Sequence, residues 1–348
     1  MKATTRLTWI TVLLFMSRGM IGPISSVFWR ELGASYLVIG VLSTVTALTS
    51  ILISPWIGQA LDRLQQRRTF LIGGLLILAA NTGGIALVPS YSWIFPLSIL
   101  ATVGQTAFGT SSLALMGDWF EYEARYSDPA VSRAGRRMGT YRGLASLGFG
   151  LMAFAAGTVV DLASLRMPFV LSGLFVGTAA VLALGMQEAP DDIAVDILHP
   201  MQDAKRDRKP GNTPAIQLPL VPLLVAALLW SLVTGAVYAV WANYMVEDVG
   251  FTPSQMTRLW SLASLTEFPL MIVAGWLSDR LGRLPMLSAG FVAWSLVFTG
   301  YLVVPAMPWI IAVQLIRGFA YSAHTATAMT YAAEVRQRPE RGRVSGYY

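Results

Sequence analysis

Four ionisable side chains interrupt long apolar stretches of this sequence and are its main candidates for chemistry: Arg18, Glu267, Arg317 and His324. A charged side chain at the centre of a lipid bilayer costs about 2.5–3.5 kcal/mol on insertion scales, so it is expected to face a protein interior or a wet cavity. An unperturbed histidine titrates near physiological pH, which suits proton transfer. These residue types therefore predict a site that binds protons and a polar solute inside a membrane.

The spacing of polar residues places several of these candidates on common helix faces. Gln314, Arg317, Tyr321 and His324 follow one another at steps of three, four and three residues, which is the spacing of one helix face. The same steps relate Ser231, Thr234, Tyr238 and Trp241, and also Thr102, Gln105, Gly109 and Ser112. Stripes of small polar residues are also typical of packing between membrane helices, so ligand contact and packing both remain open.

The charged candidates have structural alternatives as well. A lone buried arginine can hold backbone carbonyls, Arg317 can simply neutralise Glu267, and a buried histidine can be a packing residue. Our hypothesis is that Glu267 binds a proton, because a low-dielectric site favours the neutral carboxyl group. Arg317 and His324 then either tune that protonation or bind an anionic or hydroxylated substrate.

The composition indicates a membrane protein. Hydrophobic residues make up 55% of the chain and charged residues only 13%, about half the usual value for soluble domains. The absence of cysteine excludes disulfides and thiolate sites, and two histidines leave no histidine cluster, so we predict no metal and no cofactor. The net charge of +6 lies in short clusters between apolar runs, which favours membrane topology over a nucleic-acid partner.

Apolar runs predict ten membrane spans, and charge predicts their orientation. The spans are expected at residues 7–29, 36–61, 69–88, 92–117, 138–160, 168–187, 218–246, 254–277, 285–304 and 308–333. With the N-terminus in the cytoplasm, 20 of the 25 basic residues fall on the cytoplasmic side, Arg142 among them, and three on the outside: Arg30, Arg166 and Arg258. We expect the charge-rich segment 118–137 to be a cytoplasmic loop.

The sequence contains an internal repeat. At an offset of 217 residues, Gly58, Asp62, Arg63 and Gly73 recur as Gly275, Asp279, Arg280 and Gly290. A second echo relates Arg136-x-x-Gly139-x-Tyr141 to Arg343-x-x-Gly346-x-Tyr348. Two similar bundles joined by a polar segment at 188–217 imply a parallel duplication.

On these motifs the chain resembles the major facilitator superfamily, whose signature Gly-x-x-x-Asp-Arg-x-Gly-Arg stands nearly complete at 275–283. The copy at 58–68 departs from it, with Gln65 where the family prefers glycine. The residues 266–269, 313–314 and 324–331 resemble the branch of lactose permease, phenylpropionate permease and nucleoside–proton symporters. By this resemblance, Asp62 and Asp279 cap the N-termini of neighbouring helices. Arg63, Arg280 and Arg283 are expected to form pairs across the cytoplasmic face that hold a gate closed.

The resemblance implies an all-α membrane protein of the major facilitator fold. We expect a six-helix bundle at 1–187, a cytoplasmic linker at 188–217 and a four-helix bundle at 218–348. Because the superfamily has twelve spans, we also expect a chain truncated before spans 11 and 12. In the superfamily, the first and fourth spans of each half line a central cavity, and the polar stripes lie on those spans.

The expected function is secondary active transport of a small molecule by alternating access, with proton symport. A uniporter or a proton-coupled exporter is the alternative, and a membrane enzyme or channel a remote one. We expect a multi-pass monomer in lipid of the plasma membrane, not an enzyme, with its N-terminus in the cytoplasm.

Overall fold

The computed structural model describes residues 3–64, 66–126, 134–188, 220–303 and 307–334. In these ranges the chain forms helices and no strand. They are α1 (Ala3–Ile21), α2 (Ser25–Glu31), α3 (Tyr36–Leu64), α4 (Arg67–Ile85), the short 3₁₀ helix η1 (Tyr91–Trp93), α5 (Ile94–Tyr126), α6 (Ala134–Leu162), α7 (Met167–Leu184), α10 (Leu220–Asn243), the π-helical η3 (Tyr244–Asp248), α11 (Pro253–Leu281), α12 (Arg283–Val303) and α13 (Met307–Glu334).

A helix occupies each of the ten predicted spans. Eight of the described helices are long and apolar enough to cross a membrane, or nine if α1 and α2 count as one bent span. Helices suit this role because they satisfy their own backbone hydrogen bonds where no water is available. The remaining helix, α13, falls outside this set, and it carries Gln314, Arg317 and His324 among its apolar residues.

Two predicted boundaries differ from the structure. The first span is divided, because α1 and α2 meet at an angle of 42° around Gly22 and Pro23. Proline has no backbone N–H to donate and interrupts a helix there. The segment 118–137 was predicted to be a loop, which is wrong at both of its ends, since α5 continues to Tyr126 and α6 begins at Ala134. Charged residues mark where an apolar span ends, but Glu and Arg are good helix formers and extend the helix beyond it.

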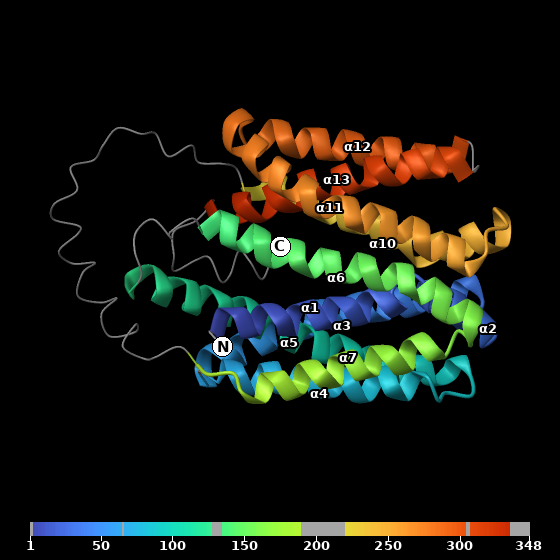
Figure 1. The fold of residues 1–348 in the computed structure, drawn as a ribbon, viewed down its shortest axis with the longest axis horizontal. Coiled ribbons are helices and arrows are strands. Elements are labelled where there is room, and N and C mark those ends of the chain that lie inside the picture. The colour runs from blue at the N-terminus through green and yellow to red at the C-terminus, as the bar shows by residue number, and fades with distance from the viewer. Residues whose placement is uncertain (1–2, 65, 127–133, 189–219, 304–306, 335–348) are drawn as a thin grey trace.

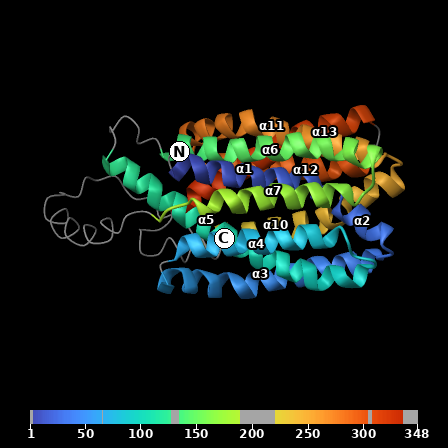
Figure 2. The same cartoon turned by 60° about the horizontal axis from the view of Figure 1, so that its bottom comes forward.

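The helices form two bundles that lie side by side in Figure 1 and overlap in the turned view of Figure 2. In the first bundle α1 packs against α6 and α7, and α4 packs against α5 and α7. In the second bundle α13 packs against both α11 and α12. The two bundles meet chiefly where α6 packs along α11, with further contacts of α10 to α2 and α3. The predicted linker at 188–217 lies, apart from Glu188, outside the described residues.

Glycines on one face of α6 allow α11 to approach closely. Gly143, Gly150 and Gly157 are seven residues apart, which places them on the same side of the helix. A Cβ atom on Gly150 would lie 3.2 Å from the backbone nitrogen of Leu265, and one on Gly157 would lie 2.7 Å from the Cα of Ser254. We call this α6–α11 contact the glycine seam, and it is the main interface between the bundles.

Candidate functional site

Glu267 lies at the glycine seam, in the middle of α11. Its side chain is only 6% exposed. The hydroxyl of Ser146 on α6 donates a hydrogen bond to Glu267 Oε2 at 2.7 Å. The hydroxyl of Ser322 on α13 donates to the backbone oxygen of Glu267 at 3.2 Å. The carboxyl group is therefore buried between the two bundles and hydrogen-bonded from one to the other.

Arg317 on α13 is equally buried, and aromatic rings surround its guanidinium group. It lies 4.3 Å from the ring centre of Trp260 and 5.2 Å from that of Tyr238. Its Nε donates to the Tyr238 hydroxyl at 3.2 Å, and its Nη1 donates to Gln314 Oε1 at 3.1 Å. The delocalised guanidinium group suits such stacking better than an ammonium group would. Arg317 and Glu267 interact electrostatically, without a direct ion pair among the described residues.

Two further arginines share this region. Arg18 on α1 is half-buried and lies 5.4 Å from the ring centre of Phe15. It interacts electrostatically with Arg142 on α6 and with Tyr321 on α13, and Tyr321 in turn interacts with Glu267. We call Arg18, Arg142, Glu267 and Arg317 the central charged cluster. Arg142 was counted among the cytoplasmic basic residues, although its place one helical turn before Ser146 inside the predicted fifth span pointed to the same face.

The remaining predicted site residues divide between this cluster and other surroundings. Tyr238, Gln314 and Tyr321 interact with members of this cluster, as described above. His324 instead stacks on Trp230 of α10 at 4.3 Å and meets Phe291 of α12 edge-on at 5.3 Å. Gln105 on α5 is half-buried.

The residues predicted to form a cytoplasmic gate lie at the end of the bundles that carries the N-terminus. Arg63 and Arg280 are exposed, and Arg280 lies 4.0 Å from the ring centre of Trp276 on its own helix. Arg283 donates from Nη1 to Ser278 Oγ at 2.9 Å.

The aspartates of the predicted gate, Asp62 and Asp279, have side chains outside the described part of the structure. Near the same end, Arg67 of α4 forms an ion pair with Asp118 of α5. This pair joins two helices of one bundle and not the two bundles.

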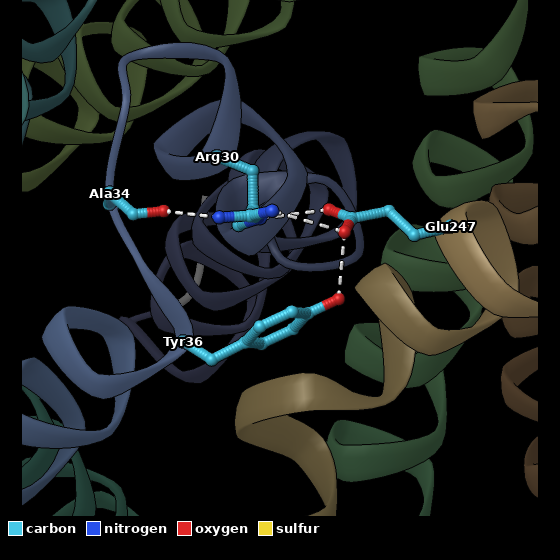
Figure 3. Close-up of polar contacts among 4 residues, drawn as sticks. All are labelled: Arg30, Ala34, Tyr36 and Glu247. Carbon is cyan, nitrogen blue, oxygen red and sulfur yellow. Dashed lines mark hydrogen bonds and ion pairs between the residues drawn. The ribbon is translucent and has the colours of Figure 1, made fainter.

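At the opposite end, an ion pair joins the bundles (Figure 3). Arg30 Nε lies 2.9 Å from Glu247 Oε1, and Arg30 Nη2 donates to Oε2 at 3.2 Å. The Tyr36 hydroxyl donates to the same oxygen at 2.9 Å, and Arg30 Nη1 also donates to the Ala34 carbonyl at 2.9 Å. Residues 30 and 247 are 217 positions apart, which is the offset of the internal repeat. This contact, which we call the outer ion pair, therefore joins equivalent positions of the two halves.

A comparison with known proteins decides the family. The sequence matches the Major Facilitator Superfamily over residues 7–348. The chain belongs to this superfamily. The expectations drawn for its family and fold class are therefore confirmed.

The sequence identity to individual related proteins is low. The chain is 26% identical over 231 residues to a protein named probable vesicular acetylcholine transporter-B from Danio rerio, covering 65% of this chain and 43% of that one. The matched region thus spans less than half the length of that relative.

Solved structures share the fold at low identity. A nucleoside transporter, NupG in its D323A form, superposes with a TM-score of 0.75 at 12% identity, covering 99% of this chain and 86% of that one. A bacterial homologue of the human lysosomal transporter Spinster gives 0.69 at 15% identity, covering 99% and 77%. A D-xylose–proton symporter gives 0.68 at 15% identity, covering 99% and 84%.

Proposed function

We propose that this transporter moves a small solute together with protons, and that Glu267 is the proton-binding residue. The observation that carries the proposal is the hydrogen bond from Ser146 to the Glu267 carboxyl group, which crosses the glycine seam. A change in the charge of this group acts directly on the contact between the two bundles. Proton binding and the movement of the two bundles would therefore depend on the same side chain, that of Glu267.

The physical argument rests on the cost of burying charge. An ionised carboxylate in a low-dielectric interior is stabilised only by nearby donors and positive charges. Here these are the Ser146 hydroxyl and the positive field of Arg317. Protonation removes the charge, and it therefore changes the relative free energy of arrangements in which the seam is closed or open. A ligand or proton shifts such an equilibrium only by its different affinity for the two states.

The proposal includes a gate at each end. The outer ion pair holds α2 and α3 against η3, so this end is held closed in the structure and must break that contact in order to open. At the other end, the resemblance assigns gating contacts to Asp62, Arg63, Asp279, Arg280 and Arg283. The excess of basic residues at that end supports placing it in the cytoplasm of a cell whose plasma membrane holds the protein.

Replacing Glu267 by glutamine tests the proposal, since glutamine keeps the size of the side chain but cannot carry a proton. In liposomes, we expect the Glu267→Gln protein to lose accumulation driven by a pH gradient and to retain exchange of solute across the membrane. Glu31→Gln is the matched control, because Glu31 is exposed at the end of α2. Full accumulation by Glu267→Gln would refute the assignment of the proton to this residue.

Export is the second candidate, and the likeness to proteins named probable vesicular acetylcholine transporters favours it. The same buried carboxyl group could serve proton–solute exchange. The sign of proton movement separates the two: symport carries protons with the solute, and antiport carries them against it. Transport that does not respond to a pH gradient would indicate a uniporter.

A further inference from the structure

The central charged cluster contains more positive than negative charge. It has three guanidinium groups, of Arg18, Arg142 and Arg317, and one carboxyl group, of Glu267. Arginine stays protonated in proteins. Of the acidic side chains that the structure describes, Glu267 is the one found to interact with these arginines, through Arg317. The two ion pairs of the described residues, Arg30–Glu247 and Arg67–Asp118, involve other arginines. Among the described residues, the positive charge of the cluster therefore exceeds its negative charge.

Hydrogen-bond donors near the cluster are also left over. Arg142 Nε and Gln314 Nε2 are buried without an acceptor among the described residues. Gln314 is fully buried, and its Oε1 already accepts from Arg317 and from the Tyr301 hydroxyl. Buried polar groups are nearly always hydrogen-bonded, and leaving one unpaired is costly. A ligand that brings acceptor oxygens would satisfy donors that the protein leaves unpaired.

Arg317 occupies the aromatic faces over which a cationic ligand would bind best. Cations bind over the faces of Trp and Tyr rings. The guanidinium group of Arg317 already lies over the rings of Trp260 and Tyr238. A quaternary ammonium ligand would have to displace Arg317 from these rings. Arg18 and Arg142, which interact with each other, add further positive charge to the cluster.

We infer that the solute bound at this site is a small organic anion whose carboxylate is held by Arg18 and Arg142. This inference rests on the transport function proposed above and names its substrate class. Guanidinium groups bind carboxylates through paired, charge-assisted hydrogen bonds, which are stronger than neutral ones. The two arginines come from α1 and α6, whereas Glu267 and Arg317 come from α11 and α13, so the anion sits between the two bundles.

Thermal unfolding of the purified, detergent-solubilised chain tests the charge of the ligand without requiring transport. The probes are matched pairs that differ in charge, glucuronate with glucose and mandelate with mandelamide, together with acetylcholine, all at equal ionic strength. A ligand that binds only the folded protein raises the unfolding temperature, and the rise grows with the logarithm of its concentration divided by its dissociation constant. We expect a carboxylate to stabilise the protein where its neutral partner and acetylcholine do not.

Arginine variants test which groups hold the anion. Arg142→Gln should weaken the carboxylate's apparent affinity about ten- to a hundredfold, as expected for losing a hydrogen bond to a charged group. Arg258→Gln, which removes an exposed positive charge near the start of α11, should leave it unchanged. If the glutamine variant does not fold, Arg142→Lys replaces it: lysine keeps the positive charge but cannot form the paired hydrogen bonds of a guanidinium group, so the carboxylate's affinity should still fall. An unchanged affinity in the folded Arg142 variants would overturn the assignment.

Three results with the wild-type protein would overturn the inference: equal stabilisation by both members of each pair, stabilisation by acetylcholine alone, or no stabilisation by any carboxylate. Its failure differs from failure of proton coupling. Glu267-dependent, pH-driven uptake of a neutral solute would refute the anionic substrate and leave the coupling proposal standing. Carboxylate binding by a protein whose uptake does not depend on a pH gradient would refute the coupling proposal and leave the anionic substrate standing.

Discussion

A methyl group added at Gly157 should push the two bundles apart at the end that carries the outer ion pair. In Gly157→Ala the new Cβ atom would lie 2.7 Å from the Cα of Ser254 and would also collide with the Thr257 hydroxyl. Overpacking of this kind costs about 1–3 kcal/mol. Because α6 stays helical whether the seam is closed or open, this cost of about 1–3 kcal/mol falls on the closed seam and corresponds to a change of about 5- to 150-fold in the equilibrium constant for opening.

Because the chain contains no cysteine, a single introduced thiol can report on the seam. Ser261 on α11 is fully buried and donates a hydrogen bond to the Gly150 carbonyl at 2.7 Å. In a Ser261→Cys background, we expect Gly157→Ala to speed labelling by a membrane-impermeant maleimide about 5- to 150-fold, since labelling follows the open fraction. Gly177→Ala is the matched control, because no atom lies within 4 Å of its added Cβ.

The reasoning fails if Gly157→Ala and Gly177→Ala label at the same rate and unfold at the same temperature. That result would mean that α6 and α11 do not approach as closely as the structure shows. Faster labelling without loss of solute exchange would place the opened state on the transport cycle. Faster labelling together with loss of exchange would mark the seam as purely structural.

Two other predictions concern single contacts. Glu247→Gln should speed labelling of the cysteine in the Ser261→Cys background, because it weakens the outer ion pair. Exchanging the two charges, with Arg30→Glu and Glu247→Arg together, should restore slow labelling. If the exchanged protein labels as fast as Glu247→Gln, the ion pair is not the cause. His324→Phe should preserve the stacked contact with Trp230 and leave pH-driven uptake unchanged, whereas His324→Ala should destabilise the protein by about 1 kcal/mol. Loss of pH-driven uptake in the phenylalanine variant would show that His324 takes part in proton transfer.

The helices could be predicted because a bilayer forces apolar runs into one regular structure. Hydropathy located all ten, including α13 despite its polar residues. The break between α1 and α2 and the extension of α5 depend on local backbone preferences, which hydropathy does not report. Charge at the centre of a span identified Glu267 and Arg317 for the same reason that hydropathy worked: lipid tolerates such groups only where the protein surrounds them.

Contacts between distant segments could not be predicted. Ser146 is an ordinary serine in the sequence, and only the packing of α6 on α11 brings its hydroxyl to Glu267. His324 shares a helix face with Arg317 by spacing, yet the path of α10 places Trp230 against it. The outer ion pair was detectable in principle, since Arg30 and Glu247 are separated by the offset of the repeat. That offset relates equivalent positions and does not by itself show that they touch.

The measurement that most directly tests proton coupling through Glu267 is the pH change outside liposomes when solute is added. The chain would be reconstituted as wild type and as Glu267→Gln, and challenged with sugars, nucleosides and organic acids. The proposal predicts that the medium becomes more alkaline on addition of the transported solute with the wild type, and that this change is absent with Glu267→Gln. Solute uptake accompanied by the same pH change in both proteins would contradict it.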